Sequence, residues 1–187
     1  MEMNQSQRLP VPQQVAWEAL NDTELLKQCI PGCESIEPDG ENSYLLAMTA
    51  AVGPVKARFK GRMALEDIQA PDSYTIRFDG QGGAAGFGKG TARVRLEPDG
   101  DETVLSYTVD AHVGGKLAQI GSRLVDAAAR KMADTFFARF TEAVTPGNDS
   151  TEDTPAAEGA PAAAAGDNEQ TEEPKRKRSW RAWISKS

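Results

Sequence analysis

Apolar and polar residues alternate with a period of two along most of the chain between residues 44 and 113. The alternation is strictest in residues 55–63, Val-Lys-Ala-Arg-Phe-Lys-Gly-Arg-Met, where every second residue is basic. This period is typical of strands that bury one face, so we expect an antiparallel sheet with one solvated face. The apolar faces of the other strands are formed by Tyr44, Leu46, Met48, Ala50 and Val52, by Tyr74, Ile76 and Phe78, by Ala92, Val94 and Leu96, and by Leu105, Tyr107, Val109, Ala111 and Val113.

The connections between these strands are of two alternating kinds. Short turns are predicted at Asp39-Gly40, Pro71-Asp72 and Asp99-Gly100. The other connections are rich in glycine and occupy residues 53–54, 80–90 and 114–115. Because alternate turns of a meander share one end of the sheet, we expect all the glycine-rich connections at the same end. A strand and not a helix follows residues 80–90, which argues against a nucleotide-binding loop.

Helical periodicity occurs at both ends of this sheet region. After residue 115 an apolar residue recurs every four positions, which predicts one long helix over residues 116–144. Before the sheet, a polar strand over residues 3–9 precedes a helix that begins at Pro12. Asn21-Asp22-Thr23 ends that helix and can cap a second one over residues 24–29. The simplest packing curls the sheet around the long helix.

Charge divides the chain into three segments. Residues 145–174 carry eight acidic residues, no basic residue and four prolines, and we expect a disordered linker there. The linker contributes −8 and residues 175–187 contribute +6 to the net charge of −7, so residues 1–144 carry −5. An acidic body argues against nucleic-acid binding. We therefore expect one folded domain over residues 1–144, followed by the linker and a basic tail.

The basic tail contains two of the three tryptophans of the chain. If it becomes helical, Trp180, Trp183 and Ile184 share one face, which suits the surface of an anionic membrane. A docking peptide for a protein partner and a solubilising end remain open alternatives. The N-terminus has no apolar signal segment and no run is long enough to span a bilayer, so we expect a cytoplasmic protein that is peripheral on the inner face of the membrane. The expected membrane-binding residues are Lys175, Arg176, Lys177, Arg178, Trp180, Arg181, Trp183, Ile184 and Lys186.

Three groups of residues could carry chemistry. Cys29 and Cys33 are interpreted as structural thiols, because metal sites need more ligands and the single histidine, His112, is far away in sequence. No Ser-His-Asp or paired-carboxylate arrangement stands out, so we expect neither catalysis nor a metal. The basic residues of one strand are typical of a solvated sheet face. If basic residues of a later strand share that face, the enlarged patch could instead bind an anionic lipid surface or an acidic partner. These residues are Lys56, Arg58, Lys60 and Arg62, with Arg93 and Arg95 in the later strand.

The order of elements resembles the helix-grip fold of the START and Bet v 1-like superfamily, an α+β fold. Such a fold has two short helices after its first strand and a curved antiparallel sheet wrapped around a long C-terminal helix. Within it, the stretches 20–22, 29–36, 53–61 and 82–94 resemble the family of the G subunit of carbon monoxide dehydrogenase over about residues 1–144. The tail after a variable linker is also similar to that family.

The resemblance implies an accessory protein of a molybdenum-containing hydroxylase such as carbon monoxide dehydrogenase. It implies recruitment of that enzyme to the membrane and an apolar cavity for a quinone or similar lipid, with no covalent cofactor and no catalytic residues carried over. A ligand-free assembly chaperone or docking factor for the same enzyme is the alternative.

The expected cavity residues lie on the apolar faces of the strands and the long helix. Periodicity alone favours an ordinary core, but the resemblance reverses this, because folds that grip a helix commonly leave a space. Phe87 lies within the glycine-rich stretch and is a candidate gate, or else a plug that fixes the loop. The expected ligand-binding residues are Tyr44, Leu46, Met48, Phe59, Met63, Tyr74, Ile76, Phe78, Phe87, Tyr107, Met132 and Phe136.

Overall fold

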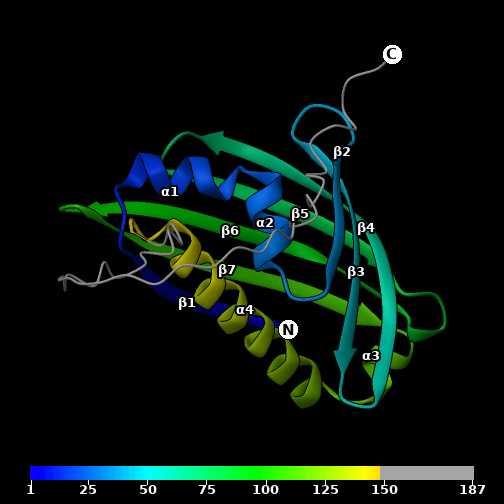
Figure 1. Ribbon diagram of the computed structural model, residues 1–187. Coiled ribbons are helices and arrows are strands. Elements are labelled where there is room, and N and C mark those ends of the chain that lie inside the picture. Colours follow the sequence, from blue (N-terminus) through cyan, green and yellow to red (C-terminus); the bar gives the residue numbers. More distant parts are fainter. Residues whose placement is uncertain (148–187) are drawn as a thin grey trace, which may run out of the picture. The chain divides into compact units, whose positions relative to one another are not determined.

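A computed structural model describes residues 1–147 of the chain. Its sheet has seven antiparallel strands in the order β1-β7-β6-β5-β4-β3-β2, so β2 to β7 form a meander and β1 returns to pair with β7 (Figure 1). The strands are β1 (Glu2–Leu9), β2 (Cys33–Pro38), β3 (Ser43–Val52), β4 (Val55–Gln69), β5 (Ser73–Gln81), β6 (Phe87–Asp99) and β7 (Glu102–Gly114). The helices are α1 (Gln13–Leu20), α2 (Thr23–Cys29), the short 3₁₀ helix η1 (Gly83–Ala85), α3 (Lys116–Gln119) and α4 (Ser122–Val144).

The sheet curves, and α4 lies across its concave side with α1 and α2 beside it (Figure 1). This confirms the helix-grip fold that the order of elements predicted. The register aligns apolar residues across the strands, for example Tyr44 with Met63 and Met63 with Phe78. Each strand therefore presents its apolar residues to the concave face, as the period of two predicted.

The long C-terminal helix is shorter than the sequence predicted. A single helix over residues 116–144 was expected, but the helix is interrupted and α4 begins at Ser122. Gly121 has φ of 97°, which lies outside the helical region and in conformations that residues with a Cβ rarely adopt. The four-residue α3 thus turns separately from α4 and buries Leu117 against the sheet end.

The densest part of the core lies where the C-terminal half of α4 meets α1, β1 and β7. Phe140 and Leu9 are completely buried, and Leu105 is 1% exposed. Thr103 is also fully buried, and its hydroxyl donates a hydrogen bond of 2.8 Å to the carbonyl of Val11. This bond satisfies a buried polar group and fixes the connection between β1 and α1 to β7.

The corner between α1 and α2 is capped as predicted. Asn21 is the C-terminal cap of α1, and Asp22 is the N-terminal cap of α2. The Asp22 carboxylate accepts hydrogen bonds from the backbone N–H groups of Glu24 at 3.0 Å and Leu25 at 3.2 Å. The cap fixes the angle between the two helices, and this corner closes one side of the space described below.

Two expectations fall beyond the folded domain. The linker at residues 145–174, apart from its first three residues, and the basic tail at residues 175–187 lie outside the described residues. Within residues 1–147, no helix is both long enough and apolar enough to cross a membrane.

Candidate functional site

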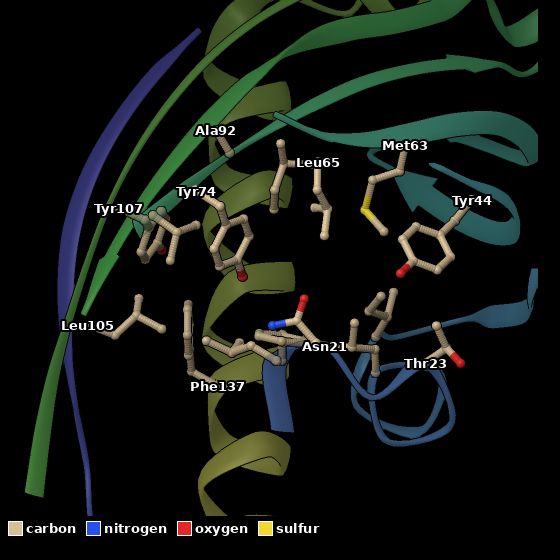
Figure 2. A pocket seen from close by; sticks show the side chains of 16 residues that line it. Asn21, Thr23, Tyr44, Met63, Leu65, Tyr74, Ala92, Leu105, Tyr107 and Phe137 are labelled. Carbon is tan, nitrogen blue, oxygen red and sulfur yellow. The ribbon is translucent and has the colours of Figure 1, made fainter. Parts of the chain in front are cut away.

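An apolar cavity of about 190 Å³ lies between the concave face of the sheet, α4 and the α1–α2 corner (Figure 2). Each wall comes from a different part of the chain: strands β3 to β7 supply one side, the aromatic residues of α4 a second, and the corner a third. The lining residues are Leu20, Asn21, Thr23, Leu26, Ile30, Tyr44, Met63, Leu65, Tyr74, Ile76, Ala92, Val94, Leu105, Tyr107, Phe136 and Phe137.

The cavity is almost free of polar groups. No Asp, Glu, Lys or Arg lines it among the residues that the structure describes. Of its three tyrosines, Tyr107 is held by the protein, because its hydroxyl donates to the Gln5 side-chain oxygen at 2.6 Å. The ring of Tyr107 stacks on Phe137 with centroids 5.3 Å apart, so this wall is fixed by aromatic packing.

Tyr74 differs from the other tyrosines of the cavity. The residue is 6% exposed, and its ring meets Trp17 edge-on with centroids 5.4 Å apart. Burial raises the pKa of its hydroxyl, which therefore stays protonated and able to donate at neutral pH. The hydroxyl points into the cavity toward the Asn21 carboxamide (Figure 2), and within residues 1–147 it forms no hydrogen bond.

Asn21 completes this polar spot. Its Nδ2 donates to the Trp17 carbonyl at 2.7 Å, which orients the carboxamide and leaves Oδ1 directed toward the cavity (Figure 2). Asn21 is exposed on its other side, so the cavity approaches the surface at the α1–α2 corner. The spot therefore offers one hydroxyl donor and one carbonyl acceptor to a neutral ligand.

A second apolar space of about 410 Å³ adjoins the cavity on the same concave face. We call it the glycine-floored groove, because Gly61, Gly80 and Gly88 stand side by side in β4, β5 and β6 beneath it. Met63, Ile76 and Ala92 line both spaces, and we call these three shared residues the neck. The groove walls are completed by Leu46, Met48, Phe59, Phe78 and Leu117.

The predicted ligand-binding residues are divided between these two spaces. The cavity contains Tyr44, Tyr74, Tyr107 and Phe136 of that set. The groove contains Leu46, Met48, Phe59 and Phe78, and Met63 and Ile76 reach both. Ten of the twelve predicted residues therefore line one or both of two adjoining apolar spaces.

Two predicted residues lie elsewhere. Met132 lines a separate groove of about 420 Å³ between α4 and β3, together with Ala128, so its expected place in the cavity is wrong. The spacing of four in α4 could not distinguish the helix face toward β3 from the face toward the cavity. Phe87 packs against His112 on the opposite face of the sheet, with centroids 6.3 Å apart. It also covers Gly114, and this position fits a plug for the loop and not a gate.

Sequence reasoning missed the wall formed by the two short helices. The cavity is lined by Leu20 of α1, Leu26 of α2 and Ile30, which follows α2, and Asn21 adds the polar group. A signal was present, because a helix-grip fold places the helices after its first strand near the mouth of the grip. Gly80 and Gly88 of the groove floor were interpreted only as loop residues, and Gly61 only as part of a strand.

Two of the four basic residues in the β4 row form ion pairs with acidic residues of the described chain. Arg58 forms an ion pair with Glu34 at 2.6 Å, and Arg62 pairs with Asp39. Alternation along the strands places Arg93 and Arg95 on this face too, and Arg95 pairs with Glu97 at 3.1 Å. Neighbouring charges of both signs fit the solvated sheet face better than a binding patch.

Both cysteines are free thiols in the described structure. Cys29 is 1% exposed and Cys33 is half-buried. Burial raises the pKa of both thiols, which disfavours the reactive thiolate. Within residues 1–147, no group of three or more His, Cys, Asp or Glu side chains could hold a metal ion.

The curved sheet and the long helix that it grips define a helix-grip fold, the fold of START and Bet v 1-like proteins. A START superfamily protein from Mycobacterium smegmatis has a TM-score of 0.59 and 15% identity, covering 76% of this chain and 96% of that chain. The Zhui aromatase/cyclase from Streptomyces sp. R1128 has a TM-score of 0.59 and 13% identity, covering 77% and 93%. At such identities the likeness concerns the fold alone.

Closer similarity identifies the family. A conserved protein from Geobacillus kaustophilus is 31% identical, with a TM-score of 0.73, covering 77% of this chain and 95% of that chain. The family model of CoxG, the G subunit of carbon monoxide dehydrogenase, matches residues 6–145. The chain therefore belongs to the CoxG family, which confirms the resemblance of its sequence motifs. A comparison with curated proteins finds no match.

Proposed function

We propose that this protein is a non-catalytic accessory factor of a carbon monoxide dehydrogenase-like molybdenum hydroxylase. It binds a quinone-like lipid in the apolar cavity and recruits the enzyme to the inner face of the cell membrane. The family, named for a component of carbon monoxide dehydrogenase, supports the choice of partner. The single observation that carries ligand binding is the uncharged cavity with its unpaired Tyr74 hydroxyl.

The chemistry of the cavity selects among lipid classes. An ionised carboxylate or phosphate would be desolvated there with no lysine or arginine of the described chain beside it. A neutral ring with carbonyl oxygens loses little on leaving water, and one carbonyl can accept a hydrogen bond from Tyr74. A quinone head has this chemistry, whereas a free fatty acid does not.

The size of the cavity is consistent with one ring. Engineered apolar cavities of about 150 Å³ bind benzene. The cavity of about 190 Å³ is therefore suited to a substituted aromatic or quinoid ring. Tyr74, Phe136 and Phe137 supply aromatic walls for such a ring.

Membrane recruitment rests on the tail. Residues 175–187 combine six basic residues with Trp180, Trp183 and Ile184, which suits reversible binding to an anionic surface. A carrier that takes a lipid from a bilayer and supplies it to an enzyme needs such an attachment. In this proposal the tail holds the protein at the bilayer that supplies the ligand.

Native mass spectrometry of the full chain, purified from its own host without detergent, tests ligand binding. We expect a bound species whose mass and absorbance, after extraction, are those of a quinone. Protein that carries no small molecule, and that also takes up no quinone when mixed with quinone-loaded neutral vesicles, would contradict the carrier. If that ligand-free protein still co-purified with the molybdenum enzyme, the assembly chaperone or docking factor would be the better description.

A further inference from the structure

The cavity is too small for a whole lipid. Sites for drug-sized ligands usually occupy about 300 to 1,000 Å³. The cavity provides about 190 Å³ and is bounded by the closely packed aromatic residues of α4, for example Phe136 and Phe137 with centroids 5.0 Å apart. A ligand with a ring in this cavity and a hydrocarbon chain must therefore continue into another apolar space.

The glycine-floored groove is the apolar space that adjoins the cavity. The neck between them is lined by a methionine, an isoleucine and an alanine, Met63, Ile76 and Ala92. Ala92 leaves room at the neck, and Met63 is unbranched and adapts its shape easily. A chain that leaves the cavity past this neck runs directly along the groove.

The glycines of the groove differ in what they permit. A Cβ at Gly61 would lie 2.2 Å from the Asp79 carbonyl oxygen, so the close approach of the backbone requires glycine there. A Cβ at Gly80 or at Gly88 would have its nearest neighbour at 3.8 Å, an ordinary contact distance. An added side chain at Gly80 or Gly88 would therefore meet no close neighbour. The same space above these two glycines is available to a ligand.

The polar spot fixes the opposite end of the ligand. Tyr74 is buried, points into the cavity and has no hydrogen-bond partner within the described chain, so a ligand oxygen beside it would satisfy its hydroxyl. The groove has an apolar lining apart from Arg62 and Asp79, which belong to the convex-face row of β4 and β5. A carbonyl therefore suits the cavity, and a hydrocarbon chain suits the groove.

We propose that the protein binds its ligand in one orientation, with a neutral carbonyl-bearing ring at Tyr74 and Asn21 and a hydrocarbon chain along the glycine-floored groove above Gly80 and Gly88. This inference rests on the proposed function and adds to it a separate binding subsite for the chain. The subsite makes the protein selective for lipids with a long chain over the same ring without one.

Menadione and phylloquinone test the subsite, because they share one ring and differ in the phytyl chain. The full chain is mixed with neutral phosphatidylcholine vesicles that contain phylloquinone, and the quinone bound to protein is measured after the vesicles are removed. Menadione binding is measured by equilibrium dialysis. The variants are Gly80→Val and Gly88→Val, and Lys89→Val is the matched control, because it places the same side chain beside Gly88 on the convex face.

We expect the wild type and Lys89→Val to extract phylloquinone, and the two glycine variants to extract at least about tenfold less. The reason is that a valine in the groove leaves part of the phytyl chain in water. Two methylene groups left exposed already weaken binding about tenfold. Menadione should bind all four proteins within about twofold, since the valines do not enter the cavity. Equal extraction of phylloquinone by all four proteins would overturn the chain subsite and leave the carrier intact. Failure of the wild type to bind either quinone would instead contradict the proposed function itself.

A second pair of variants tests the hydrogen bond between Tyr74 and the ring of the ligand. Tyr74→Phe should weaken menadione binding about 5- to 10-fold, which corresponds to one hydrogen bond, and should leave binding of methylnaphthalene unchanged. Tyr107→Phe serves as the matched variant, because the hydroxyl it removes is bonded to Gln5. If Tyr74→Phe affected both compounds equally, the residue would act through packing, and the proposed orientation would be wrong.

Discussion

At the scale of single residues, the side-chain hydroxyls of the domain differ in whether the protein itself supplies a hydrogen-bond partner. The hydroxyls of Thr103 and Tyr107 are satisfied by the protein itself, at 2.8 Å and 2.6 Å. The hydroxyl of Tyr74, a residue that is 6% exposed, forms no hydrogen bond within the described chain. A hydroxyl that is directed into a cavity and has no partner within residues 1–147 is available to a ligand oxygen, as the proposed function requires.

The cysteines provide a residue-scale prediction about stability. Replacing Cys29 and Cys33 with Ser should leave quinone binding unchanged, because neither thiol lines the cavity or the groove. The free energy of unfolding should fall by about 1–3 kcal/mol, since the Cys29 site is 1% exposed and would bury a hydroxyl. Urea denaturation at neutral pH measures this change. Loss of quinone binding by a folded double variant would show that the thiols have a role in the site.

The same thiols should make the free energy of unfolding depend on pH. Burial raises the pKa of Cys29 and Cys33 above the value of about 8.5 in the unfolded chain, so unfolding releases protons at alkaline pH. Their contribution to stability is complete below that pH and is lost as the pH rises toward the folded-state pKa. Between about pH 8 and 9.5, the wild type should therefore lose more stability than the double Ser variant. Parallel curves for the two proteins would contradict this linkage.

At the scale of elements, the α1–α2 corner connects stability with binding. Asp22→Ala should lower the free energy of unfolding by about 1 kcal/mol, because two backbone N–H groups of α2 lose their acceptor. Asp22→Asn is the control, since asparagine caps about as well as aspartate. Menadione should bind more weakly to the Ala variant, because Asn21 and Thr23 beside the cap line the cavity. Equal binding by the Ala and Asn variants would show that the corner is held by packing alone.

The elements also show what the sequence could and could not predict. The strands and their inward residues followed from the period of two, because one-sided burial imposes that period on every strand of the meander. The break at Gly121 and the position of Met132 did not follow. A spacing of four describes a helix stripe without saying which neighbour covers each part of it, and α4 has two different neighbours, the cavity on one side and β3 on the other.

The division of the cavity region was likewise hidden from the sequence. Tyr44, Met63 and Phe78 align across neighbouring strands, and their shared face was predictable from alternation. The boundary between cavity and groove depends on how far α3 and the α1–α2 corner reach over that face. Such tertiary distances leave no periodic trace, so the sequence predicted a single ligand-binding set and not a division into two spaces.

At the scale of the whole molecule, the proposed function divides lipid binding and membrane attachment between two segments of the chain. The folded residues contain the cavity, and Arg58 and Arg62 of the convex face are paired with acidic residues. Residues 1–144 are acidic, with a net charge of −5, and should be repelled by an anionic surface. We therefore expect attachment to such a surface to depend on residues 175–187, whose six basic residues exceed in charge any other short segment of the chain.

Truncation after residue 174 tests this separation. Each Lys or Arg near an anionic bilayer contributes about 1 kcal/mol, so the tail supplies up to about 6 kcal/mol before the repulsion of the acidic linker is subtracted. The full chain should sediment with anionic vesicles at low salt and be released as salt is raised, because screening weakens the attraction. The truncated chain should stay in solution and still bind menadione as the full chain does. Trp180→Ala with Trp183→Ala should weaken sedimentation even at low salt, since the interfacial burial of both rings is lost while the charge is kept. Equal sedimentation of the full and truncated chains would reject the anchor, and the tail would then be better explained as a docking peptide for the enzyme.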